Sequence, residues 1–179
     1  PSVWQLEGYD RPIYRNHALT WEDIPELETE PDPPTVPSSF NPVGTYRRTA
    51  EIPAEWGPDR RTYLHFEGVK SAFFVWIDGE YVGYDQGSMT PSEFDVTDAL
   101  DPGEEHTLTV QVFRFSDGSY LETQDMLRFS GIFRSVYLYS KPAVHLRDFF
   151  VRTAFDATYE DATLSIDVDL AAEFDLSEY

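Results

Sequence analysis

The amino-acid sequence predicts an all-β fold, a two-sheet β-sandwich, from three observations. Several short runs alternate apolar and polar side chains, which is the pattern of a half-buried strand. Aromatic residues make up 16% of the 179 residues, and the 10 glycines and 13 prolines are scattered as turn residues are in β-proteins. No heptad, internal repeat or low-complexity tract interrupts this pattern. Each strand needs a covering layer for its apolar face, so two packed sheets are expected.

Residues 24–44 are predicted to form an extended loop that wraps over the rest of the protein. This stretch contains six prolines and four acidic residues. Proline removes a backbone donor and breaks both helices and central strands, so neither element is expected here.

The strands of the sandwich are predicted to follow at residues 45–52, 62–66, 71–84, 108–115 and 136–140. The clearest signal is SAFFVWIDGEYVGY, in which two β-rich runs flank Asp78 and Gly79. Asp-Gly favours a type I′ turn, because both central positions of that turn need a positive φ. A β-hairpin that turns at these two residues is therefore expected.

A domain boundary is predicted near residues 140–142, which divides the chain into residues 1–141 and 142–179. Two further runs with strand character, residues 145–155 and 162–174, follow it. The second run alternates, and the apolar face that we expect to point into a core consists of Leu164, Ile166, Val168 and Leu170. Because two or three strands do not make a stable domain alone, the end of the chain is interpreted as the start of a second β-domain, cut short.

The charge and composition of the chain restrict its partners. Thirteen Lys and Arg against 33 Asp and Glu give a formal net charge of −20, whereas nucleic-acid binding needs a basic surface. No apolar run approaches the roughly 20 residues of a membrane helix, and the first residues show no secretory signal. The absence of cysteine excludes disulfides and thiolate metal sites. No nucleic acid and no membrane are expected as partners, and a cytoplasmic location is expected.

The cations of the chain are nearly all arginine, since only Lys70 and Lys141 are lysines. High salt screens the self-repulsion of an acidic surface that would otherwise loosen the fold. We interpret the combination as adaptation to salt, and an ordinary acidic protein is the alternative.

Motifs for several kinds of active site are missing. There is no G-x-S-x-G elbow and no G-x-x-x-x-G-K phosphate loop. The histidines also lack a metal-ligand spacing such as H-x-x-x-H; they are His17, His65, His106 and His145.

Residues 116–134, SDGSYLETQDMLRFSGIFR, combine acidic residues, arginines, serines and large apolar side chains, whereas a simple connection between strands needs only turn residues and solubility. Glu122 and Asp125 lie three residues apart, which makes a glycosidase carboxylate pair conceivable, and a solvated acidic loop is the alternative. Outside this stretch, Asn16 is one of only two asparagines, with Asn41. Its amide offers the donor and the acceptor that sugar hydroxyls need, and an Asn that caps a turn is the alternative.

Long segments of the sequence carry a resemblance to a known family. In order, they are PSVWQLEGYDRPIYRN (1–16), NPVGTYRR (41–48), FEGVKSAFFVWIDGEYVGYDQGSMTPSEFDVT (66–97), RFSDGSYLETQDMLRFSGIFRSVYL (114–138) and DFFVRT (148–153). Together they resemble the N-terminal part of the large multidomain β-galactosidases of glycoside hydrolase family 2.

The resemblance implies a fold for this chain and a separate, later domain for catalysis. Residues 1–141 would be a jelly-roll sugar-binding domain of the galactose-binding type that lacks its first strands, and residues 142–179 would open an immunoglobulin-like sandwich. Catalysis in the family is retaining and uses two glutamates of a later (β/α)8 barrel. The resemblance therefore implies no catalytic residue in this segment, magnesium ligands outside it, and no activity for the segment alone. Expected partners are a β-galactoside such as lactose, the other domains of the same chain, and further copies in a homo-oligomer.

The resemblance also implies a substrate site. The asparagine of the IYxN motif, Asn16, would hydrogen-bond galactose. The aspartate of the QDM motif, Asp125, would bind the galactose 6-hydroxyl and Na⁺. Tyr14 and His17 would line the same pocket, although the family's reference member has an aliphatic residue in place of His17. Leu127 stands where a tryptophan often follows QDM.

The remaining residues of the 116–134 stretch are interpreted as architecture. Gly118 and Gly131 are expected to allow its turns, and Glu122 is expected to be structural or solvated. Six side chains are expected to anchor the stretch in the core: Tyr120, Leu121, Met126, Phe129, Ile132 and Phe133.

Two other functions remain open. One is a free-standing carbohydrate-binding or adhesion module with no barrel, which the reading frame beyond Tyr179 would reveal. The other is a family 2 enzyme that acts on a β-mannoside or β-glucuronide, although SYLETQDM resembles the β-galactosidase branch.

Overall fold

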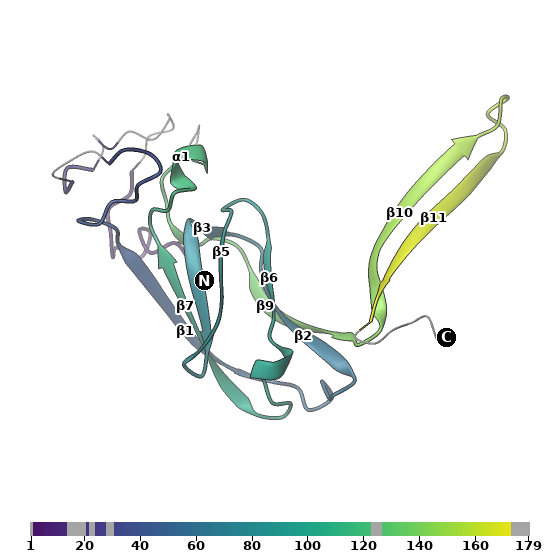
Figure 1. Ribbon diagram of the computed structural model, residues 1–179, viewed down its shortest axis with the longest axis horizontal. Helices are drawn as coiled ribbons and strands as arrows, with labels where there is room; N and C mark the ends of the chain where they lie inside the picture. The colour runs from purple at the N-terminus through teal and green to yellow at the C-terminus, as the bar shows by residue number, and fades with distance from the viewer. Residues whose placement is uncertain (1, 14–20, 22–23, 28–30, 123–126, 173–179) are drawn as a thin grey trace.

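The protein is an all-β molecule, as predicted (Figure 1). Its computed structural model describes residues 2–13, 21, 24–27, 31–122 and 127–172. The strands of the two main sheets are all antiparallel to their neighbours. One sheet has the order β1-β7-β4-β5, formed by β1 (Val43–Glu51), β7 (Glu105–Phe113), β4 (Ala72–Ile77) and β5 (Glu80–Gln86). The other has the order β6-β2-β9, formed by β6 (Ser92–Asp95), β2 (Arg60–Phe66) and β9 (Val136–Pro142).

Alternating side chains from both sheets meet in one core. In β2, for example, Leu64 and Phe66 point inward and are at most 1% exposed, whereas Tyr63 and His65 between them are only partly buried. Phe66 packs against Phe73 of β4, with ring centroids 4.9 Å apart. The buried members of the core are Trp4, Ile52, Leu64, Phe66, Val69, Phe73, Val75, Ile77, Val96, Leu100, Val110, Val112 and Ile132. The predicted two-layer sandwich is confirmed.

The hairpin predicted from Asp-Gly is also confirmed. Asp78 and Gly79 both adopt a positive φ, of 50° and 90°. They form a two-residue loop, because Ile77 pairs with Glu80 across it. This is the backbone that a type I′ turn requires.

Short elements lie between the strands of the two sheets. A two-stranded ladder joins β3 (Val69–Lys70) to β8 (Gly131–Ile132), and a single helical turn, α1 (Ser119–Glu122), follows β7. A 3₁₀ turn, η2 (Thr97–Ala99), follows β6. The predicted strand at 108–115 ends two residues early, at Phe113, so Arg114 and Phe115 lie outside the sheet. No helix within the described parts of the chain is long and apolar enough to cross a bilayer.

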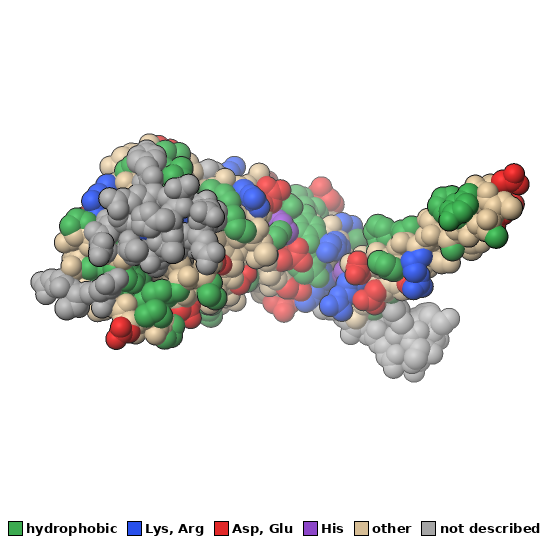
Figure 2. Space-filling view, turned by 90° about the horizontal axis from the view of Figure 1, so that it is seen from above, with side chains coloured by type: hydrophobic (Ala, Val, Ile, Leu, Met, Phe, Trp, Pro, Cys, Tyr) green, Lys and Arg blue, Asp and Glu red, His purple; other side chains and the backbone are tan. Residues whose placement is uncertain are grey.

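The end of the chain forms a hairpin that projects from the sandwich (Figure 1). It consists of β10 (His145–Phe155) and β11 (Ala162–Ala171). The predicted alternation in β11 is present: three of its apolar residues pair with Leu146, Phe149 and Val151 of β10, and Leu164 pairs with Thr153. These apolar residues are not buried as expected, because no other described segment covers them. Their side chains lie 46–61% exposed, and apolar groups are visible on the surface of the hairpin in Figure 2. An immunoglobulin-like domain from residue 142 stays a prediction.

Candidate functional site

The predicted substrate residues fall on two segments outside the described residues. Tyr14, Asn16 and His17 belong to 14–20, and Asp125 belongs to 123–126. The described structure shows what flanks these segments, and it brings the flanks together. Ile13 forms an antiparallel bridge with Arg128, whose N–H donates to the Ile13 carbonyl at 3.1 Å.

A second hydrophobic cluster supports the same end of the molecule. It packs the proline-rich loop against the residues that follow β7. Trp21 lies edge-on to Phe115 and to Tyr120, with centroid distances of 5.3 and 5.5 Å. The Tyr120 hydroxyl donates to the carbonyl oxygens of Thr35 at 2.8 Å and Pro31 at 3.2 Å. The described part of the loop packs over other residues, as predicted, but it is not uniformly extended: it turns at residues 25–26 and 33–34 and bends at 38–40.

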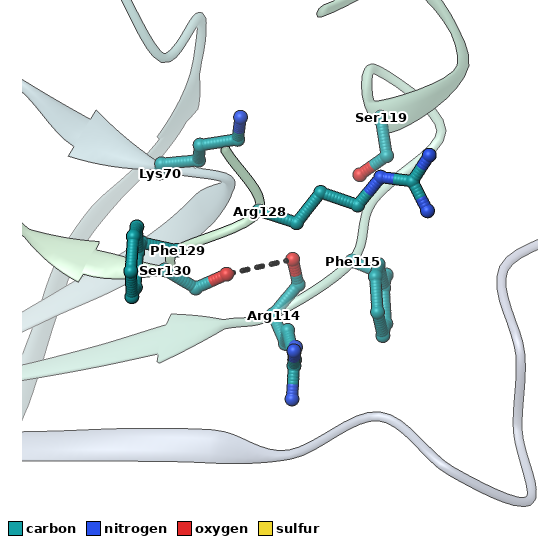
Figure 3. A pocket seen from close by; sticks show the side chains of 7 residues that line it. All are labelled: Lys70, Arg114, Phe115, Ser119, Arg128, Phe129 and Ser130. Atoms are coloured by element: carbon teal, nitrogen blue, oxygen red, sulfur yellow. Dashed lines mark hydrogen bonds between the residues drawn. The ribbon is translucent and has the colours of Figure 1, made fainter. Parts of the chain in front are cut away.

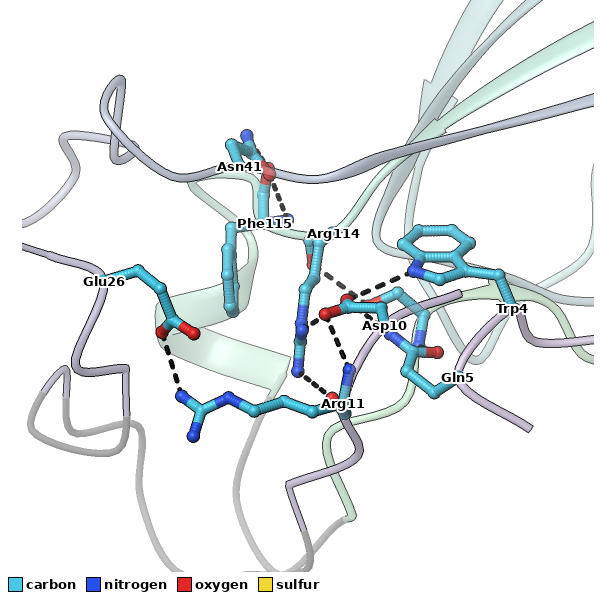
Figure 4. Close-up of polar contacts among 9 residues, drawn as sticks. Trp4, Gln5, Asp10, Arg11, Glu26, Asn41, Arg114 and Phe115 are labelled. Carbon is cyan, nitrogen blue, oxygen red and sulfur yellow. Dashed lines mark hydrogen bonds and ion pairs between the residues drawn. The ribbon is translucent and has the colours of Figure 1, made fainter. Parts of the chain in front are cut away.

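A buried ion pair ties the approach to residue 13 to the end of β7 (Figure 4). The guanidinium of Arg114, 2% exposed, donates to the carboxylate of Asp10 and, at 3.1 Å, to the Arg11 carbonyl. The same carboxylate accepts a hydrogen bond from Trp4 Nε1 at 3.2 Å. Burial lowers the pKa of Arg114, and the charge of Asp10 opposes that shift. Removal of either partner would leave a buried charge uncompensated.

The second asparagine of the chain is a structural residue. Asn41 Oδ1 accepts the N–H of Phe115 at 2.9 Å, and Asn41 Nδ2 donates to the Phe115 carbonyl at 3.0 Å. The Asn41 amide thus supplies both hydrogen bonds that a neighbouring strand would otherwise make to Phe115, which lies beyond the end of β7. An asparagine amide can therefore pair with a backbone N–H and C=O as well as with sugar hydroxyls. For this reason, the presence of an asparagine in the sequence does not by itself identify a sugar-binding residue.

Glu122 is structural, one of the two roles predicted for it. Its carboxylate accepts the backbone N–H of Ser88 at 3.1 Å and the Ser88 hydroxyl at 2.5 Å. Ser88 is fully buried, so the contact fixes α1 to the loop after β5. The segment 123–126 therefore starts from an anchored residue.

One detail of the 116–134 stretch differs from expectation. Leu121, expected in the core, is 82% exposed, because it lies on the outer side of α1. Gly118 lies in a turn, as expected, although without a positive φ, whereas Gly131 has φ of 125°. A Cβ at Gly131 would lie 2.4 Å from the Tyr46 hydroxyl, so this position requires glycine. Ile132 is buried and Phe129 and Phe133 are partly buried, as expected, and Met126 lies outside the described residues.

The sequence signalled the Asp10–Arg114 pair only faintly. Arg114 is a charged residue at the end of an apolar strand, and Asp10 precedes the IYxN motif within a conspicuous DRP sequence. Their partnership spans 104 positions, which no local pattern connects. The Ser88–Glu122 contact is similarly nonlocal.

Comparisons with known proteins fit this geometry. Residues 1–142 match the family model of the glycosyl hydrolases family 2 sugar-binding domain. The chain is 51% identical over 98% of its length to a β-galactosidase of Priestia megaterium and 47% identical over 97% to one of Alteromonas mediterranea. It spans 16% of the length of each of these relatives.

Solved structures show the same architecture. A β-glucuronidase from an uncultured Clostridium species is 28% identical, with a TM-score of 0.61 over 72% of this chain and 24% of that one. A β-glycosidase from Bacteroides vulgatus, at 23% identity, shares the fold with a TM-score of 0.64 over 97% of this chain and 20% of that one. The chain belongs to glycosyl hydrolase family 2 and contains the sugar-binding domain of that family.

Proposed function

We propose that this chain is the sugar-binding part of a retaining β-galactosidase and supplies one wall of its active site. The relatives of highest identity described above are named β-galactosidases, and they match nearly the whole chain. The proposed activity removes terminal β-D-galactose from a substrate such as lactose. Its acid and nucleophile would be two glutamates of another domain, and its magnesium ligands would lie outside this chain as well.

The β-bridge between Ile13 and Arg128 is the structural observation that supports a shared sugar-binding site. It holds the residue before Tyr14 beside a residue three positions after Asp125. Residues that flank two motifs more than 100 positions apart therefore meet, which supports a shared sugar pocket. Asp10–Arg114 and Glu122–Ser88 fix the neighbouring backbone.

The proposed roles follow from the chemistry of the side chains. The amide of Asn16 would donate to one galactose hydroxyl and accept from another. The carboxylate of Asp125 would accept the 6-hydroxyl and would bind Na⁺, a hard cation that prefers oxygen ligands. Tyr14 and His17 would line the same pocket. The complete enzyme would be a homo-oligomer in which the other domains close the site.

A β-glucuronide is the second candidate substrate, because one similar structure is a β-glucuronidase. That protein is 28% identical to this chain, against 51% and 47% for the two β-galactosidases. Rates of the full-length protein on nitrophenyl β-galactoside and β-glucuronide decide between them. Turnover of neither by a correctly folded full-length protein would favour a binding module.

The decisive variant is Asp125→Asn in the full-length enzyme, with Glu122→Gln as its control. Asn keeps the shape of the side chain but loses its charge, and a lost hydrogen bond to a charged group costs about 1.5–3 kcal/mol. We expect kcat/KM on a galactoside to fall by roughly 10- to 150-fold. The loss should be smaller for the matching arabinoside, which lacks the 6-hydroxymethyl group, and the sodium response should weaken.

Glu122→Gln should change both rates much less, because its partner Ser88 can still hydrogen-bond to the amide. Equal losses on galactoside and arabinoside in Asp125→Asn, with the sodium response intact, would make Asp125 a scaffold residue.

A further inference from the structure

A small cavity next to the β3–β8 ladder encloses a lysine ammonium group. Lys70 of β3 is 6% exposed, and its Nζ makes no hydrogen bond to any residue that the structure describes. Figure 3 shows it at the cavity wall together with Arg128, which is 3% exposed. An ammonium without a partner loses its hydration and gains nothing in return, so this arrangement needs a ligand or the loss of a proton.

The charges around the cavity are one-sided. Among the residues that the structure describes, the lining consists of Lys70, Arg114, Phe115, Ser119, Arg128, Phe129 and Ser130, and none of these seven is acidic. The chain as a whole has 33 acidic residues and 13 Lys and Arg, so a lining with three cations and no acid is the reverse of its general composition.

Two carboxylates near the cavity, both within the described part of the chain, already have hydrogen-bond partners. Asp10 binds the guanidinium of Arg114, which neutralises that member of the lining. Glu122 favours the charged form of Lys70 through its field, but both of its oxygens accept hydrogen bonds from Ser88. Burial lowers the pKa of Lys70, and the nearby Arg128 lowers it further. A bound negative charge would offset both effects.

The size of the cavity restricts the ligand. Its volume is about 10 Å³, which is room for one particle of about the size of a water molecule. A tetrahedral oxyanion or a carboxylate does not fit in that space without rearrangement. A water molecule fits and accepts a hydrogen bond, but it brings no charge to balance the ammonium. A monatomic anion satisfies both conditions.

We propose that this cavity is a halide site in which chloride binds the ammonium group of Lys70. The positive charge of Arg128 adds to the attraction, and Phe115 and Phe129 form the apolar part of the lining. The bound ion joins β3 to the residues between β7 and β8. It therefore stabilises the base of the stretch that carries α1.

Bromide replaces chloride in the direct test. Crystals of the full-length protein soaked in bromide should show an anomalous peak within hydrogen-bonding distance of Lys70 Nζ. A water molecule at that position, or an empty cavity, would overturn the proposal without any variant being needed.

A solution test uses hydrogen exchange in the full-length protein, with chloride compared to sulfate at matched ionic strength. Backbone amides of β3 and β8 should exchange roughly tenfold more slowly when chloride is at ten times its Kd, because local opening then requires release of the ion. Sulfate should leave the exchange rates unchanged. Lys70→Met should abolish the chloride response.

Lys141→Met is the matched control, since Lys141 is the other lysine and lies over the rings of Tyr63 and Tyr139 in β2 and β9. It should respond to chloride as the wild type does. A chloride response that survives Lys70→Met, or that sulfate reproduces, contradicts a halide site at Lys70.

Discussion

Replacement of Asp10 by asparagine should loosen the approach to the proposed sugar site. The carboxylate is the anionic partner of Arg114, and the two side chains are only 12% and 1% exposed. Asparagine keeps the size of the side chain, so the change isolates the charge. The Arg114 guanidinium would then remain buried without a counter-charge.

The size of the effect follows from the burial of the pair. Removal of one partner of a buried ion pair costs about 3–5 kcal/mol. Because Asp10 is slightly exposed and Asn still accepts hydrogen bonds, we expect the lower end, about 3 kcal/mol, which corresponds to a factor of about 150 in a local opening equilibrium. The same displacement should raise the KM for a galactoside, since residue 10 leads directly into the segment that carries Asn16.

Hydrogen exchange measured by mass spectrometry reads this local equilibrium in the full-length protein. The peptides to follow cover residues 2–13 and 110–118. Glu26→Gln is the control, because its ion pair with Arg11 at 3.0 Å has side chains that are 40% and 45% exposed. Exposed pairs contribute about 0–1 kcal/mol, so exchange should change at most a few-fold. If Asp10→Asn accelerates exchange no more than Glu26→Gln does, the buried pair does not hold this segment in place.

Three other predictions concern backbone strain, acid stability and salt. Gly131→Ala should destabilise the protein by about 2 kcal/mol or more in denaturant titrations, because its φ is 125° and its Cβ would collide with a tyrosine hydroxyl; Gly57→Ala, with no atom within 4 Å of its Cβ, should be nearly neutral. Hydrogen bonds from the Thr107 N–H and from His106 lower the pKa of Asp78 below its ordinary value of 3.8, so its stabilising contribution is present above that pH and is lost as the pH falls through the folded-state pKa. Asp78→Asn should therefore flatten the acid side of a stability–pH curve, and an unchanged curve would show that the carboxylate contributes nothing. If the charge of −20 reflects adaptation to salt, the melting temperature should rise as ionic strength increases from about 0.15 M to beyond 1 M at fixed chloride, and a flat or falling curve would leave plain acidity.

Local patterns predicted the elements of the fold correctly where short-range physics decides them. The type I′ turn follows from Asp78 and Gly79 because the positive φ values are a property of two adjacent residues. Strand alternation likewise placed Leu64 and Phe66 in the core. Leu121 was predicted wrongly, since a single helical turn has an outer side and hydrophobicity alone does not say which residue occupies it.

The polar framework of the candidate site was much harder to predict. Asp10 and Arg114 are 104 positions apart in the sequence, and Glu122 and Ser88 are 34 positions apart. Charged residues are numerous in this chain, so composition gives no reason to single out these partners. The residues proposed to contact sugar were inferred from family resemblance and lie outside the described part of the structure.

The projecting hairpin has a consequence for how the molecule unfolds. β10 and β11 contact each other extensively, but their apolar face gains nothing from the core of the sandwich. A lone two-stranded ribbon is at best marginally stable in water. Wherever this ribbon has no further partner, it should open as an independent cooperative unit, at a free energy far below that of global unfolding. A melting curve of the 179-residue chain would then report the sandwich alone, while the ribbon would already be fraying at ambient temperature.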